Sequence, residues 1–193
     1  LAHLYHISIV PPKFGISKDK YQYDKETNVI AKGIASVKFM SAAIGNELYA
    51  LAHDNRPETF MDLRLRIDNE TSLNSRQRDI LIKVDYFSDY GNAKELLRMV
   101  EVFSFFKNGT MKKISKEKLS AQFEKIVRKY STDVSKSGAP AKSYTILDMH
   151  GLLNEFERRI RDLHIHDFDY KSKMQNQLEN MGYIDLTTNK PED

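Results

Sequence analysis

Apolar residues recur every three or four positions through most of the chain after Gly33, which restricts the fold to packed amphipathic helices. The first set of apolar residues with this spacing, which we call a stripe, predicts a helix over about 40–53. Pro57 stands where a second helix can begin. Asn74 opens a capping-box pattern, and Asn92 is suited to cap a further helix. Three later stripes predict helices at Leu119 to Tyr130, Ile146 to Leu163 and Met174 to Met181.

The first 33 residues follow an extended pattern instead. A short alternating run at 6–10 stops at Pro11-Pro12. Residues 21–24 and 28–31 flank a polar turn at 25–27, which predicts a β-hairpin. A small β-element is therefore expected before the helices.

Basic residues gather between Lys107 and Lys142, where ten Lys and Arg face three acidic residues. Such a strip attracts phosphate, but it also suits a solvated helix face. Residues 131–143 contain Ser137-Gly138-Ala139-Pro140, which is typical of a loop. The pattern predicts a basic helix followed by a flexible loop.

Two short stretches, 33–43 and 81–93, have the composition of sharp turns before a helix, with a lysine close by. We call them the first and the second hairpin. In a helix-hairpin-helix, the turn and the start of its second helix present backbone N–H groups to a phosphate. The helix dipole and a nearby lysine add to this attraction, without reading the bases.

These stretches resemble the alpha subunits of bacterial DNA polymerase III. The resemblance covers most of 7–106 and, more weakly, 172–193. Four segments match: Val10-Pro11-Pro12; Gly33-Ile34-Ala35-Ser36-Val37-Lys38; Leu81-Ile82 through Phe87 with Gly91, Asn92 and Leu96-Leu97; and Glu179-Asn180-Met181-Gly182-Tyr183-Ile184. The last segment resembles the family's junction into an oligonucleotide-binding fold.

The resemblance implies a mainly α fold, with a tandem helix-hairpin-helix, a small N-terminal β-hairpin and a C-terminal helical extension. The expected parts are 1–33, extended segment and β-hairpin; 34–107, tandem helix-hairpin-helix; 108–145, basic helix and flexible loop; 146–182, helical extension; and 183–193, the start of a linker to a following domain.

The function implied is that of a non-catalytic piece of a replicative DNA polymerase, which holds duplex DNA through phosphate contacts. The parent is a nucleotidyltransferase, and it brings the sliding clamp and other replisome subunits as partners. No cofactor is expected for this piece. The candidate DNA contacts are Lys32, Ser36, Lys38 and Ser41 in the first unit, and Ser88, Gly91, Asn92 and Lys94 in the second.

The first hairpin departs from the family pattern. Where the family has Gly-hydrophobic-Gly after the lysine, this chain has Phe39-Met40-Ser41. Loss of the glycines removes the easy positive φ and the close approach of a phosphate. We therefore expect the first hairpin mainly to pack against other elements. The second hairpin, which keeps Gly91, is favoured as the contact with DNA.

Two other functions stay open. His164 and His166 with Asp167 and Asp169 could ligate the metal of a hydrolase, although the other histidines are scattered. The chain could also be a protein-interaction module that docks the clamp or another subunit through its helices at 118–130 and 146–165. No nucleophile with a base and an orienting group is recognisable.

The chain has no cysteine, which gives no sign of an oxidising compartment. No apolar run approaches the roughly 20 residues that span a bilayer. Leu1-Ala2-His3-Leu4 shows neither a signal peptide nor an initiator Met. We therefore expect an internal fragment of a longer cytoplasmic protein, with no membrane partner.

Overall fold

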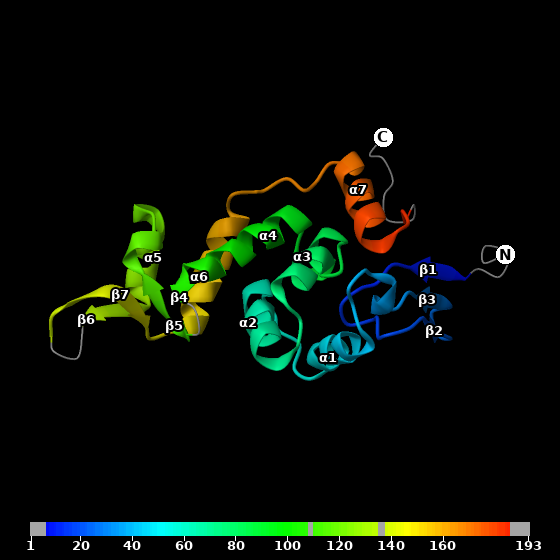
Figure 1. The fold of residues 1–193 in the computed structure, drawn as a ribbon, viewed down its shortest axis with the longest axis horizontal. Coiled ribbons are helices and arrows are strands. Elements are labelled where there is room, and N and C mark those ends of the chain that lie inside the picture. The colour runs from blue at the N-terminus through cyan, green and yellow to red at the C-terminus, as the bar shows by residue number, and fades with distance from the viewer. Residues whose placement is uncertain (1–6, 108–109, 135–137, 186–193) are drawn as a thin grey trace.

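Two small sheets lie at opposite ends of an elongated mixed α/β molecule, and most of its helices lie between them (Figure 1). The computed structural model describes residues 7–107, 110–134 and 138–185. Within these residues seven α-helices account for less than half of the chain. The expectation of a mainly α fold is therefore met only in part, because the second sheet was not predicted. In the same part of the chain, no helix has the length and apolar character needed to cross a membrane.

The N-terminal sheet has three strands, β1 (Ser8–Val10), β2 (Gln22–Asp24) and β3 (Val29–Ala31). β2 and β3 form the predicted antiparallel hairpin. The Asp24 carboxylate accepts hydrogen bonds from the Glu26 N–H (2.9 Å) and the Thr27 hydroxyl (2.6 Å), which closes the turn. β1 pairs with β3 in parallel, which the local pattern did not indicate.

Four helices follow, in the order α1 (Ala42–His53), α2 (Phe60–Glu70), α3 (Ser75–Lys83) and α4 (Ala93–Val102). The predicted caps are confirmed: Asn74 forms a capping box with Gln77, and Asn92 accepts from the Glu95 N–H. Single 3-10 turns at η2 (Ile34–Ser36) and η3 (Ser88–Tyr90) precede α1 and α4. Buried apolar side chains from all four helices form one core.

The prediction of a flexible loop within 108–145 is wrong for its described residues. A second sheet forms there, with strands in the order β4 (Phe106–Lys107), β5 (Thr110–Ser115), β7 (Pro140–Ile146) and β6 (Ser131–Val134). Ile114 pairs with Tyr144 across β5 and β7, and both side chains are buried. Lysines beside these few apolar residues obscured the alternation in the sequence. The helical part of the prediction holds as α5 (Ala121–Lys129).

Two helices complete the fold, α6 (Met149–Arg161) and α7 (Tyr170–Met181). The apolar faces of α5 and α6 meet, with the rings of Phe123 and Phe156 5.5 Å apart. The alternative function had these faces docking a partner, and in the structure they cover each other and, on α5, the second sheet. α7 lies against α3 and ends at Gly182, as predicted. Of the predicted linker at 183–193, residues 183–185 form no helix or strand, and the rest lies outside the described residues.

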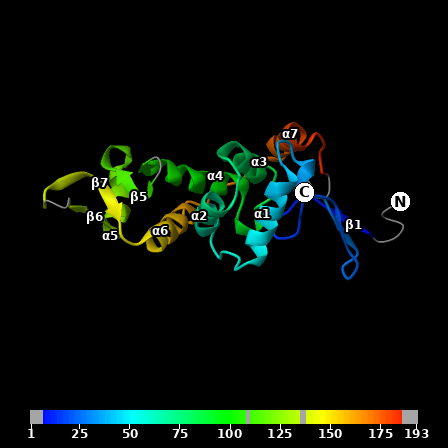
Figure 2. The ribbon, with the colours of Figure 1, turned by 60° about the horizontal axis from the view of Figure 1, so that its bottom comes forward.

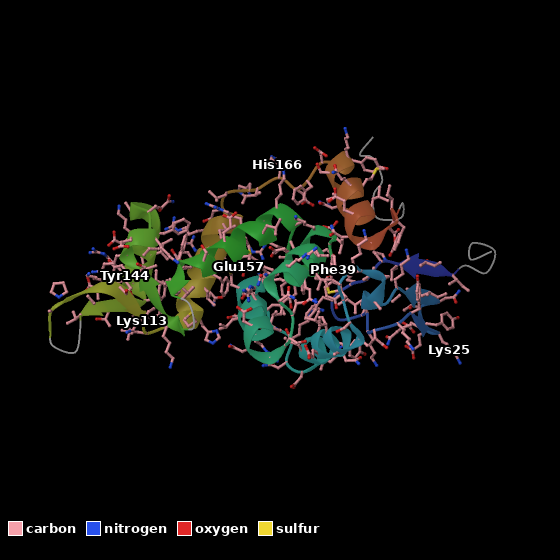
Figure 3. All side chains as sticks on the ribbon, in the orientation of Figure 1. Lys25, Phe39, Lys113, Tyr144, Glu157 and His166 are labelled. Atoms are coloured by element: carbon pink, nitrogen blue, oxygen red, sulfur yellow. The ribbon has the colours of Figure 1, made fainter. Side chains whose placement is uncertain are left out.

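An ion pair of α6, in which Glu157 is buried and Arg161 is partly exposed, joins three of these helices near the centre of the molecule, where Glu157 is labelled in Figure 3. The Glu157 carboxylate accepts from the backbone N–H groups of Phe60 (3.4 Å) and Met61 (2.9 Å), at the start of α2. Arg161 donates to Glu157 (2.6 Å), to Glu95 on α4 (3.2 Å) and to the backbone oxygen of Tyr90, the last residue of η3 (2.8 Å). We call these three side chains the α6 ion network.

Glu157→Ala should destabilise the protein by about 1–3 kcal/mol, because it leaves the backbone N–H groups of Phe60 and Met61 without their acceptor and takes one partner from Arg161. Urea unfolding followed by circular dichroism measures this. Arg158→Ala, exposed on the same helix, is the control and should cost less than about 1 kcal/mol. Equal losses in both variants would contradict this role of the network.

Candidate nucleic-acid interface

The first hairpin is entered through η2 and leads directly into α1. Ser36 donates its hydroxyl to the Gly33 oxygen (2.8 Å), and the Ser41 hydroxyl accepts from the Ile44 N–H (3.3 Å). Both predicted contact serines therefore serve the local backbone. The hydroxyl of Ser41 already satisfies one N–H of the first turn of α1.

Phe39 takes the left-handed conformation, with φ of 66°, although it is not a glycine. Loss of the glycines was expected to remove the easy positive φ, and Phe39 adopts a positive φ without a glycine. Contacts from α3 hold it: Gln77 donates to the Phe39 oxygen (2.7 Å), and Arg76 lies 4.2 Å above its ring. Such a conformation costs a residue other than glycine about 1–2 kcal/mol, which these contacts offset.

The start of α1 beside Phe39 is open to solvent. Residues 41–43 are exposed, and the Phe39 side chain is 56 % exposed. Lys38 is also exposed, and its backbone and side-chain nitrogens donate to the oxygens of Asn180 (2.7 Å) and Glu179 (2.5 Å). The end of α7 therefore anchors the hairpin from one side and leaves the helix start uncovered.

A groove of about 640 Å³ runs along this hairpin between α3 and α7. Three cations line it: Lys38 from the hairpin, and Arg76 and Lys83 from α3. The acidic lining residues are Asp79 and Glu179, so positive charge prevails by one. Arg76 and Lys83 were not among the predicted contacts. Their seven-residue spacing on a predicted helix was the signal that could have found them.

Lys32 does not belong to this surface. Its ammonium pairs with Asp185 (3.2 Å) and lies 4.0 Å above the Tyr183 ring, and its side chain is 16 % exposed. Burial alone would lower the pKa of Lys32, but Asp185 and Tyr183 outweigh this and raise it. Lys32 therefore fastens the segment after α7 to the end of β3.

The second hairpin joins α3 to α4 through η3, where Ser88 is exposed. Gly91 has φ of 143°, and a Cβ there would lie 2.5 Å from Glu95 Oε2 and 3.4 Å from Arg161 Nη1. The glycine is thus needed for the α6 ion network. A phosphate that approached Gly91, as the sequence predicted, would lie near the Glu95 carboxylate, which would repel it.

The start of α4 is covered by the segment that links α6 to α7. Asn92 donates its amide to the Ile165 oxygen (2.8 Å), and the Asp167 carboxylate accepts from the Lys94 N–H (3.4 Å). A carboxylate of the chain therefore already lies where a phosphate would be expected. The Lys94 ammonium is 5.1 Å from the Phe168 ring centroid.

Lys173 of α7 fixes this linking segment. Its ammonium lies 2.6 Å from an Asp167 oxygen and 3.2 Å from an Asp85 oxygen. Burial raises the pKa of Asp85, and Lys173 offsets this only in part. Burial would lower the pKa of Lys173, but the two carboxylates raise it. Lys173 therefore allows two carboxylates to lie near each other beside the second hairpin.

The predicted histidine cluster lies in the same segment, but His166 is exposed (Figure 3). In the described part of the chain, no three His, Cys, Asp or Glu side chains are placed to hold a metal ion. The spacing that suggested a hydrolase thus does not assemble a site there.

The basic strip forms a separate surface at the far end of the molecule, where Lys113 is labelled in Figure 3. Several of its cations are paired, such as Lys116 with Asp133 (2.9 Å) and Arg128 with Glu124 (3.0 Å). It therefore does not extend the groove of the first hairpin.

Comparison of the chain with protein-family models and with curated proteins gives no match.

Gly91→Ala should destabilise the protein by about 1–3 kcal/mol more than Gly182→Ala, because only the first substitution adds a clash to the backbone strain. Gly182 also has a positive φ, but a Cβ there meets no atom within 4 Å. Urea midpoints of the two variants test this. Equal destabilisation would show that Glu95 and Arg161 adjust freely to the new methyl group.

Lys173→Met should make stability more dependent on pH, because Asp85 and Asp167 would then repel each other without the ammonium. A carboxyl whose pKa is higher in the folded state binds more protons when folded, so its charge destabilises the fold above that pKa. At pH 7 the variant should be less stable than the wild type, and we expect this difference in stability to shrink as pH falls toward about 5. Urea midpoints across this range measure it.

Lys171→Met, exposed on the same helix, is the control and should follow the wild type throughout. A Lys173→Met deficit that stays constant between pH 7 and pH 5 would contradict the electrostatic explanation.

Proposed function

We propose that this chain is a non-catalytic segment of a replicative DNA polymerase, similar to the alpha subunit of bacterial polymerase III. In this proposal its two hairpin units form a tandem helix-hairpin-helix that holds duplex DNA. The first hairpin, with the start of α1 and the cations of α3, makes the phosphate contacts. The second hairpin supports the fold. This reverses the order of importance that the sequence favoured.

The observation that supports this most is the left-handed Phe39, which keeps the first hairpin folded next to an exposed helix start. Lys38 and Arg76 stand beside it on one groove. Exposed N–H groups, a helix dipole and cations together favour a phosphate over any other group of DNA. The exposed Phe39 ring can also lie against a sugar, because it is apolar and held by Arg76.

Contacts of this kind would be independent of base sequence and sensitive to salt, since each bound phosphate releases counterions. A replicative polymerase needs this behaviour, because it moves over every sequence. In the proposal the catalytic carboxylates belong to the parent protein, a cytoplasmic nucleotidyltransferase. The sliding clamp and the other replisome subunits are then partners of that parent.

Random-sequence duplex DNA in a fluorescence anisotropy titration tests the proposal at several salt concentrations. Lys38→Ala and Arg76→Ala should each weaken binding and lower the slope of log K against log salt by about 0.9. Lys94→Ala should change both quantities less, because the start of α4 is covered.

Lys25→Ala, in the β-hairpin turn at the right-hand end of Figure 3, is the matched control and should leave binding unchanged. Binding that does not respond to salt would contradict the proposal. An equal loss for Lys25→Ala and Lys38→Ala would show only a general effect of net charge.

A further inference from the structure

Two arginines are buried side by side in a second groove of the helical core. Arg64 of α2 is 6 % exposed and Arg78 of α3 is 5 % exposed, although arginine is rarely buried to this extent without full pairing. The groove measures about 550 Å³ and lies where α2, α3 and α4 meet. Figures 1 and 2 both show these three helices next to one another.

The hydrogen bonds of these guanidinium groups are incomplete. Within the described residues, the Nε–H groups of Arg64 and Arg78 have no partner. Each arginine has one carboxylate close by: Asp68 for Arg64, and Asp79 for Arg78 at 3.3 Å. Asp68 and Asp79 are partly open to solvent, and each leaves donors of its arginine unused. A buried donor without a partner costs roughly 1–3 kcal/mol, and a bound ion is one arrangement that removes this cost.

The charges around the groove favour an anion. Arg64, Arg78 and Lys83 contribute three positive charges, and the acidic lining residues are Asp79 and Glu101. Glu101 already pairs with Arg98, which is not part of the lining. Burial lowers the pKa of Arg64, and repulsion from Arg78 lowers it further. An anion between the two arginines would relieve that repulsion.

We propose that this groove binds a phosphate group, with Arg64 and Arg78 as its main ligands and Lys83 as a supporting charge. Guanidinium groups present several N–H donors in a planar fork that matches two oxygens of a phosphate. Two forks from different helices, with an ammonium nearby, suit a doubly charged tetrahedral oxyanion better than a single carboxylate. The ring of Phe103, 4.8 Å from the Arg64 guanidinium carbon, forms an apolar wall behind it.

The groove is separate from the first hairpin, although Asp79 and Lys83 line both grooves. The proposal does not depend on DNA binding by the hairpin. The phosphate can come from free phosphate or from a nucleic-acid backbone, because the same donors recognise both. The experiment therefore begins with inorganic phosphate and no DNA.

Thermal unfolding of the full chain is followed at constant ionic strength while phosphate replaces chloride. The wild type should gain about 3–5 °C in Tm for each tenfold rise in phosphate above Kd. Arg64→Met and Arg78→Met should lose this dependence. Arg98→Met, exposed on α4, should keep it and thereby report the general effect of phosphate on folding.

Arg78→Met should in addition be at least as stable as the wild type in chloride, since it removes a like charge beside Arg64. This result separates loss of a ligand from loss of the fold. Where a methionine variant does not fold, Arg78→Lys keeps the charge but not the planar guanidinium fork. Its apparent Kd for phosphate should rise at least tenfold.

The same gain of Tm in the wild type and in both arginine variants would overturn the proposal, and so would the absence of any gain in the wild type. The salt slope of DNA binding by Arg78→Met then identifies the source. A slope lower by about 0.9 indicates a backbone phosphate, and an unchanged slope indicates free phosphate. Failure of DNA binding with phosphate binding intact would count against the proposed function alone.

Discussion

The ion pair between Glu157 and Arg161 determines how the helical part of this protein is put together. Glu157 caps α2 through two backbone N–H groups, and Arg161 reaches both Glu95 on α4 and the last turn of η3. A buried carboxylate is tolerated only with such partners, since burial of an unpaired charge is very costly. These contacts tie α6 to α2 and α4, and they place the second hairpin beside α6.

In the second hairpin this arrangement leaves the start of α4 covered. Gly91 leaves room for Glu95, and the segment after α6 covers the start of α4 through Asp167. The first hairpin lies outside the network, held by α3 and α7 contacts around Phe39. Two stretches with similar local sequence thus have different surroundings. Only the first presents an exposed helix start beside cations, which supports it as the DNA contact.

Local sequence patterns predicted the helices, strands and turns better than they predicted the tertiary contacts around them. The β2–β3 hairpin, the capping box at Asn74 and the end of α7 at Gly182 all depend on neighbours within a few residues. The second sheet was missed because its strands are short, and lysines stand beside the few apolar residues that face α5. Ile114 and Tyr144 lie 30 positions apart, so their pairing leaves no local period to detect.

The sequence by itself determined the helical stripes, the caps and the turns, because side chains a few positions apart set these features. It also determined a resemblance to polymerase alpha subunits, which stays a proposal about function. Tertiary structure decided which hairpin is exposed and which is covered. It also brought Arg64 and Arg78 together on one groove. The physical reason is distance along the chain: the bonds of Glu157 to Met61 and of Arg161 to Glu95 join residues 96 and 66 positions apart, and no local pattern encodes them.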